Sequence, residues 1–146
     1  MPRAERILGF ASWVADALDT LAVVAALIAS YHAVRLLAEH MDAVGALALL
    51  LEAFGVLHYL YAVPREKPPR TAMEVAGYLV FRVAVVVLVS APLIVAAYRF
   101  PGQIPPTALV YFAVALWLVF ASAFIHAGRV AYGIIARVRK ACRKTG

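Results

Sequence analysis

The sequence predicts an all-α integral membrane protein, a bundle of four transmembrane helices with both termini in the cytoplasm. Hydrophobic residues make up 65% of the 146 residues and the mean hydropathy is +0.87, which is too apolar to cover a soluble globule of this size. Four apolar segments, near 14–37, 43–63, 73–98 and 107–135, each reach the ~20 residues that cross about 30 Å of hydrocarbon. We therefore expect residues 1–146 to form a single four-span membrane domain.

The distribution of lysine and arginine predicts the orientation, because short basic loops stay on the cytoplasmic side. The basic residues gather before the first span, between the second and third, and after the fourth: Arg3, Arg6, Arg65, Lys67, Arg70, Arg137, Arg139, Lys140, Arg143 and Lys144. The two other connections hold only Arg35 and Arg99. The expected location is the inner (cytoplasmic) membrane, where this face, with most of the net charge of +6, would meet anionic lipid headgroups rather than nucleic acid.

The first span has a basic start that resembles a signal peptide. Asp16 and Asp19 interrupt the apolar run, however, and the stretch that follows is long enough to span, so an uncleaved signal anchor is the better interpretation. Small residues then recur on one helical face, at Ala22, Ala26, Ser30 and Ala33. Such a face lets helices approach closely in lipid, although alanine is also simply common here.

Prolines delimit the remaining spans. The second span is expected to stop at Pro64, and Pro92 is expected to kink the third near its outer end. The turn-rich loop from Phe100 to Pro106 makes the third and fourth spans antiparallel neighbours. The fourth segment has more helical residues than a bilayer needs, so we expect its basic end to project along or out of the inner surface.

Two opposite charges inside consecutive spans predict an intramembrane ion pair. Glu52 and Arg82 stand 12 and 13 residues from the turn at Pro64–Pro69, so both lie roughly 18–20 Å from it at about 1.5 Å per helical residue. Unpaired charges at that depth cost roughly 2.5–3.5 kcal/mol each. The pair would fix the helix register. In the alternative arrangement Arg82 leans on Tyr78, one helical turn away, and Glu52 is protonated.

The order of these features resembles the phosphate-starvation-inducible protein E (PsiE) family. The pattern reads Glu52, fifteen residues, Pro68, one residue, Arg70, eleven residues, Arg82, and the flanks Leu50–Phe54 and Tyr78–Arg82 are also similar. The resemblance covers essentially the whole chain. It implies a small four-helix bundle of the inner membrane and a link to phosphate limitation, without an established biochemical activity.

Two histidines raise a chemical alternative. His58 and His126 lie in the second and fourth spans, both in the inner leaflet, and two imidazoles from different helices can ligate haem b. Arg82 or Arg129 could pair with the propionates, and Gly55 and Gly128 could give the macrocycle room. The competing interpretation is that these are ordinary satisfied or interfacial histidines. His32 and His40 lie toward the outer side beside charged residues, where a surface cluster is expected and no metal site.

Asp16 and Asp19 share a face in the first turns of the first span. Acids there are favoured by the helix dipole. The alternative is a polar relay through Asp19, Glu52 and Arg82. Either His58 or His126 would complete this path and make the protein a proton or ion conduit.

Motifs for catalysis are not found in the sequence. It has no glycine-rich phosphate loop, no nucleophile elbow and no paired metal ligands on one helix, and Cys142 is the single cysteine. We therefore expect a non-enzymatic accessory or assembly protein that forms a homo-oligomer or joins a larger membrane complex. The haem b electron-transfer subunit and the proton or ion conduit are the alternatives from other classes.

Overall fold

The computed structural model describes residues 2–146, and these residues form helices and no strand. The elements are α1 (Pro2–Glu39), α2 (Ala43–Ala62), the short 3-10 helix η1 (Val63–Arg65), α3 (Ala72–Val89), α4 (Ala91–Arg99) and α5 (Pro106–Thr145). Within this part of the chain four helices are long and apolar enough to cross a membrane: α1, α2 with η1, α3 and α5. The prediction of four apolar helices is confirmed.

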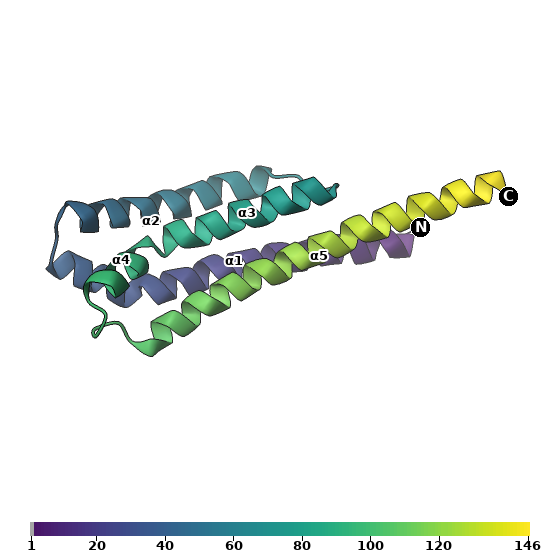
Figure 1. Ribbon diagram of the computed structural model, residues 1–146. Helices are drawn as coiled ribbons and strands as arrows, with labels where there is room; N and C mark the ends of the chain where they lie inside the picture. Colours follow the sequence, from purple (N-terminus) through teal and green to yellow (C-terminus); the bar gives the residue numbers. More distant parts are fainter. Residues whose placement is uncertain (1) are drawn as a thin grey trace.

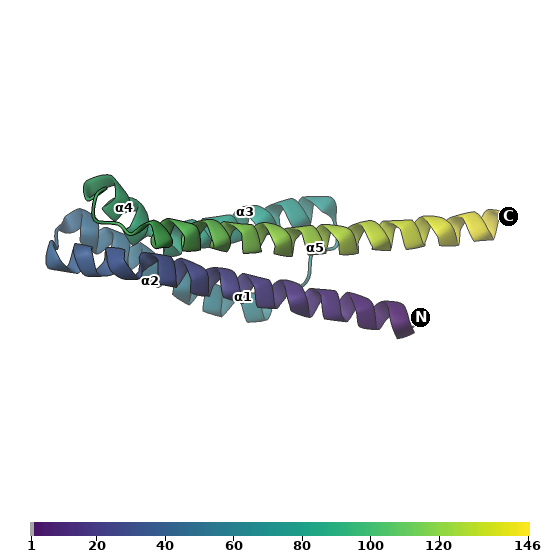
Figure 2. The same cartoon turned by 90° about the horizontal axis from the view of Figure 1, so that it is seen from below.

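The long helices alternate in direction along the chain (Figure 1). Both ends of the chain therefore lie toward the same end of the molecule as the loop 66–71, which we call the terminal end. The connections at residues 40–42 and 100–105 lie at the opposite end, which we call the hairpin end (Figures 1 and 2). This arrangement is what an even number of spans requires.

Side-chain caps explain where two of the helices begin. The Asp42 carboxylate accepts a hydrogen bond from the Gly45 backbone N–H at 2.7 Å and caps α2. The Thr71 hydroxyl accepts from the Glu74 N–H at 3.2 Å and caps α3. Each cap satisfies one of the orphan N–H groups of a helix start. α5 begins instead at Pro106, whose missing N–H is no loss at the first helical position.

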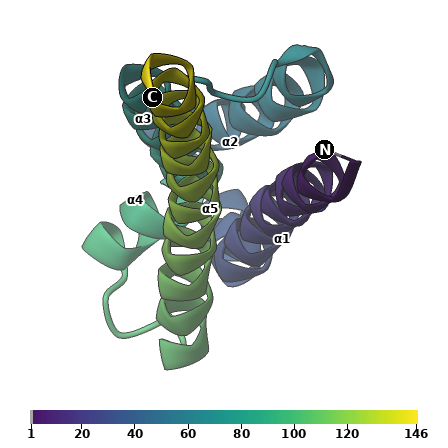
Figure 3. The ribbon, with the colours of Figure 1, turned by 90° about the vertical axis from the view of Figure 1, so that its right-hand side faces the viewer.

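The pair α1 and α5 forms the most extensive helix contact in the structure (Figure 3). The expected small-residue face of α1 is confirmed, because Ala22, Ala26, Ser30 and Ala33 are all fully buried. α5 also buries small residues at intervals of seven, namely Ala108, Ala115 and Ser122. Small side chains on both helices let the two backbones come close together.

The third apolar segment is broken, as Pro92 predicts. α3 ends at Val89, Ser90 lies between the helices, and α4 starts at Ala91 with the proline in its first turn. The Val89 carbonyl accepts a hydrogen bond from the Ser30 hydroxyl of α1 at 3.1 Å. A serine from a neighbouring helix thus serves a backbone group at the break, which is how lipid-embedded helices tolerate proline.

α1 and α5 continue at the terminal end beyond α2 and α3 (Figure 1), and they diverge as they do so (Figures 2 and 3). The 40 residues of α5 span about 60 Å at 1.5 Å per residue. That is twice the ~30 Å of a hydrocarbon core. The excess helical length expected after residue 135 is therefore present as an unbroken continuation of α5 to Thr145.

Candidate functional site: a buried polar cluster

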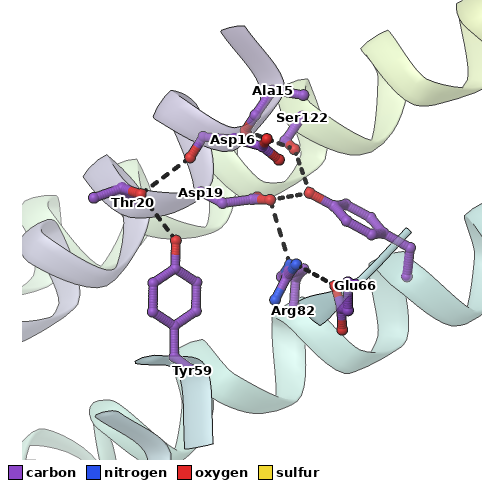
Figure 4. Close-up of polar contacts among 9 residues, drawn as sticks. Ala15, Asp16, Asp19, Thr20, Tyr59, Glu66, Arg82 and Ser122 are labelled. Carbon is purple, nitrogen blue, oxygen red and sulfur yellow. Dashed lines mark hydrogen bonds and ion pairs between the residues drawn. The ribbon is translucent and has the colours of Figure 1, made fainter. Parts of the chain in front are cut away.

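Arg82 is the centre of the site, and its partners differ from the one expected. The guanidinium is 3% exposed, its Nε lies 3.3 Å from the Asp19 carboxylate, and its Nη2 donates to the Glu66 carboxylate at 2.5 Å (Figure 4). Asp19 comes from α1 and is 1% exposed, whereas Glu66 comes from the loop after η1 and is 37% exposed. The cation thus joins α3 to α1 and to the terminal-end loop.

Tyr78 and Ser122 complete the Asp19 side of the cluster. The Tyr78 hydroxyl donates to the Asp19 carboxylate and lies 2.8 Å from the Ser122 hydroxyl of α5. Ser122 in turn donates to the Ala15 carbonyl at 3.2 Å. Tyr78 and Arg82 are one helical turn apart on α3, so one face of α3 presents both groups to α1. We call Asp19, Glu66, Tyr78, Arg82 and Ser122 the polar cluster.

A second contact brings in α2. The Tyr59 hydroxyl lies 3.0 Å from the Thr20 hydroxyl of α1, and Thr20 donates to the Asp16 carbonyl at 3.1 Å. The Arg82 guanidinium also lies over the rings of Tyr78 and Tyr59, at 4.8 and 5.6 Å from their centroids. All four long helices therefore converge at one level of the bundle. Arg82 therefore leans on Tyr78, as in the alternative to the ion pair with Glu52.

Glu52 does not meet Arg82, and the helix register explains why. Gly55 of α2 packs against Leu88 and Val89, while Tyr59 lies beneath the guanidinium. Tyr59 is therefore level with Arg82, and Glu52 lies seven residues, about 10 Å, farther toward the hairpin end. Counting from the turn missed this offset because the extended loop 66–71 is not a symmetric turn. Glu52 is half-buried and takes part in no ion pair with any described residue.

A small polar cavity adjoins the cluster. It has a volume of about 50 Å³ and its lining includes Ser12, Asp16, Glu66, Tyr78, Arg82 and His126. Arg82 Nη1 and His126 Nε2 are buried and have no hydrogen-bond partner among the described residues. Water can both donate and accept hydrogen bonds, and this volume suits one or two water molecules. The cavity is too small for an organic substrate, whose pockets usually measure 300 Å³ or more.

The two histidines of the haem alternative have separate aromatic surroundings. His58 packs on Phe54 and Phe81, with ring centroids 5.7 and 5.1 Å away. His126 is 2% exposed, lies edge-on to the Tyr78 ring at 4.7 Å and accepts from Arg129 Nη1 through Nδ1 at 3.2 Å. α3 packs against both α2 and α5, which have no substantial contact with each other. The two imidazoles are therefore not brought together as a facing pair.

The space expected for a macrocycle is present at only one of the two glycines. A Cβ on Gly55 would lie 3.1 Å from Leu88 Cβ and Val89 Cγ2, so α3 already fills that position. A Cβ on Gly128 would meet nothing within 4 Å. The expectation that Gly55 leaves room for a haem was wrong, because the same missing side chain is used for close helix packing.

Charged residues at the hairpin end form one ion pair. Arg99 of α4 forms an ion pair with the Asp42 carboxylate. The Gly45 N–H and then Arg99 hold the pKa of Asp42 below its ordinary value, because both favour the carboxylate form. His40 packs on Phe100 at 5.2 Å between centroids. Within residues 2–146 no three histidine, cysteine or acidic side chains gather as metal ligands would.

The sequence predicts a place in a polar relay for Asp19, but it does not predict Asp19 as the main partner of Arg82. It also does not predict that Glu66 binds Arg82. A signal for Asp19 was available, because Ala15, Asp19, Ala22 and Ala26 follow one helical face that is buried in the structure. An acid on the buried face of a span needs a cation, and Arg82 is the cation nearest the middle of the third span. Asp16 is exposed beside the cavity and stays outside the polar cluster.

The fold and the site together define a class, an all-helical protein whose four apolar helices are joined by a buried polar cluster. Comparisons with protein-family models, with curated proteins and with solved structures find no match. The resemblance to the PsiE family therefore stays a prediction.

Proposed function

We propose that this chain is a four-span protein of the inner membrane, with both termini in the cytoplasm, that works as a non-enzymatic accessory subunit in a homo-oligomer or larger membrane complex. The resemblance to the PsiE family supports the bundle and adds a proposed link to phosphate limitation. Protein levels compared between phosphate-replete and phosphate-limited cells test that link directly.

Glu52 is the observation that carries the accessory role. It lies near the middle of α2, half-buried, on the same side of the helix as the buried residues Ala48, Gly55 and Tyr59. A carboxylate without a cation at that depth costs roughly 2.5–3.5 kcal/mol or has to be protonated. A donor from a second protein that reaches its exposed part would remove that cost, so α2 is the helix we assign to the interface.

The polar cluster supports a structural rather than a chemical role for the other charges. Arg82 and Asp19 are almost fully buried, and the adjoining cavity admits only water-sized molecules. The contacts of the cluster, together with the neighbouring hydrogen bond between Thr20 and Tyr59, connect every long helix. A cluster of this kind specifies which helices pack together and in what register, the best-attested use of buried polar groups.

The orientation can be tested with the single cysteine. Cys142 is exposed on the C-terminal part of α5, so a membrane-impermeant maleimide should label it in inverted membrane vesicles and not in spheroplasts. Gln103→Cys combined with Cys142→Ser moves the only thiol to the hairpin end and should give the opposite result. Labelling of Cys142 in intact spheroplasts would contradict the proposed orientation.

The assembly can be tested at Glu52. Light scattering of the detergent-purified protein should give an oligomer, or a co-purifying partner should be present, and Glu52→Gln should weaken that assembly about tenfold or more. Glu5→Gln is the matched control, because Glu5 is an exposed acid at the start of α1. A monomer without a partner, unchanged by Glu52→Gln, would contradict the accessory role.

A proton conduit is the second candidate, and the polar cavity is the observation that favours it. The cavity connects ionisable groups from α1, α3, α5 and the loop 66–71. Toward the hairpin end, however, the packed residues are mainly apolar, including Ala29, Ala33, Leu37 and Leu93. A pH-sensitive dye in proteoliposomes tests it. Flux lost in Asp19→Asn but not in Glu5→Gln would favour conduction over the accessory role.

A further inference from the structure

The divergence of α1 and α5 at the terminal end opens an apolar groove between them. Its volume is about 270 Å³, and its lining includes Ile7, Leu8, Ala11, Ile125, Gly128 and Tyr132. Gly128 contributes to the opening, because a Cβ built there meets nothing within 4 Å. Here α1 and α5 no longer pack against each other as they do along the alanine face.

A second pocket of about 250 Å³ adjoins this groove and has the opposite character. Arg70, Arg129 and Arg137 line it, together with apolar residues and Gly133, and its lining contains no acidic side chain. Gly133 lies midway between the two arginines of α5, and a Cβ there would also meet nothing within 4 Å. The groove and the pocket share Leu8 and Arg129, so they lie next to each other.

None of the three arginine side chains takes part in an ion pair within the described chain, and the acid nearest to them in contact, Glu74, accepts from the backbone N–H of Arg70. The Nε of Arg129 is buried without a hydrogen-bond partner, while its Nη1 is held by His126. Guanidinium groups bind phosphate oxygens through paired N–H donors. The pocket therefore has the charge and the donors for a phosphate group.

The positions of the apolar groove and the arginine pocket along α5 favour a phospholipid as the source of that phosphate. α5 runs toward the terminal end, so Ile125 in the groove lies about 18 Å before Arg137 along the helix axis. A phospholipid in the cytoplasmic leaflet has the same order, with its acyl chains deeper and its phosphate at the surface. Basic pockets between helices on the cytoplasmic side are known sites for anionic headgroups.

We propose that the groove and the pocket together form a site for one anionic phospholipid, with an acyl chain between α1 and α5 and the headgroup phosphate between Arg70, Arg129 and Arg137. The site rests on the proposed orientation, because it needs the terminal end at the cytoplasmic surface. It differs from general attraction of the basic face to lipid in being a single defined place with a fixed stoichiometry.

Native mass spectrometry of the detergent-purified chain, titrated with phosphatidylglycerol, tests the site. The wild type should retain one phosphatidylglycerol in preference to phosphatidylcholine. Arg129→Gln with Arg137→Gln should lower that affinity about 30-fold, from about 1 kcal/mol for each charge. Arg139→Gln with Arg143→Gln is the matched control, with the same charge loss on the same helix outside the pocket, and should change the affinity less than threefold.

Two glycine variants distinguish a lipid from a free anion without changing the charge. Gly128→Leu should fill the groove and Gly133→Leu the pocket, and each should reduce phosphatidylglycerol retention at least fivefold. If inorganic phosphate competes with phosphatidylglycerol and Gly128→Leu leaves retention unchanged, the lipid proposal is contradicted and the site binds a free anion. Equal losses in the two double arginine variants would overturn a defined site. Cys142 labelling is independent of both results, so a failed lipid site and a failed orientation can be told apart.

Discussion

The polar cluster and the hairpin end hold the same four-helix bundle together in different ways. In the cluster, a few charged and hydroxyl groups from α1, α3, α5 and the loop 66–71 are joined by ion pairs and hydrogen bonds. At the hairpin end the core is Ala29, Ala33, Leu37, Ala48, Leu93, Ala96 and Ala108, small or aliphatic side chains whose only means of attraction is close contact. The cluster should therefore be sensitive to loss of a partner, and the hairpin end to added volume.

The largest effect is expected from stranding a charge in the polar cluster. Arg82→Leu leaves Asp19 buried at 1% exposure without a cation and should cost about 3–5 kcal/mol of stability. The double variant Asp19→Leu with Arg82→Leu should recover most of that loss, because no uncompensated charge remains. Thermal unfolding in detergent measures both.

Glu52→Leu supplies the control for this cycle. Its combination with Arg82→Leu should be additive, since the two residues do not touch. A stronger coupling of Arg82 to Glu52 than to Asp19 would contradict the partner assignment and restore the ion pair expected from the sequence.

The hairpin end should respond to volume instead. Ala33→Leu adds three carbons to a fully buried position on the α1 face and should cost about 1–3 kcal/mol. Ala38→Leu makes the same chemical change at an exposed position of the same helix and should stay within about 0.5 kcal/mol of the wild type. Equal stabilities of the two variants would show that α1 does not pack closely there.

A smaller effect is expected at the junction between the two regions, where Gly55 of α2 contacts the end of α3. Gly55→Ala places a Cβ 3.2 Å from the Val89 backbone nitrogen, beside the break between α3 and α4. It should lower stability by about 1 kcal/mol. Gly77→Ala, with nothing within 4 Å, should raise stability by up to about 1 kcal/mol through helix propensity. Unfolding curves in which both substitutions stabilise would argue against the close approach of α2 and α3.

The smallest effect is expected from the exposed pair of Asp42 and Arg99. The pKa of Asp42 is lower in the folded state than its ordinary 3.8, so its contribution to stability is complete above that value and is lost as the pH falls through the folded pKa. The stability difference between the wild type and Asp42→Asn should therefore be constant at neutral pH and shrink below pH 3.8. A difference that persists well below that pH would contradict the prediction.

The comparison also explains how much could be predicted from the sequence. The number of apolar helices, the alanine face of α1 and the break at Pro92 depend on local composition and spacing, and all three are found. The partners of Arg82 depend on how far α2 and α3 slide past each other and on which way each helix is turned. The six-residue loop 66–71 sets that offset, and counting residues from Pro64 and Pro69 could not supply it.

The charged groups outside the spans were the harder part of the site. Glu66 stands in a stretch between Arg65 and Lys67 that was interpreted as a basic surface loop, yet its carboxylate reaches back to Arg82. The sequence predicts the helices that carry His58 and His126. It does not predict that α3 packs against both α2 and α5 and so keeps the two imidazoles from facing each other. Depth in a membrane can be counted along a sequence, whereas rotation about a helix axis depends on every neighbour at once.

The pairing of Asp19 with Arg82 also sets an order of events while the protein is made. The two residues are 63 positions apart, so a ribosome adding about 5–20 residues per second finishes Arg82 about 3–13 s after Asp19. During that interval the nascent chain carries an acid whose cation has not yet been synthesised. The ion pair between α1 and α3 therefore forms only after α3 has been made, whatever contacts α1 and α2 have already formed with each other.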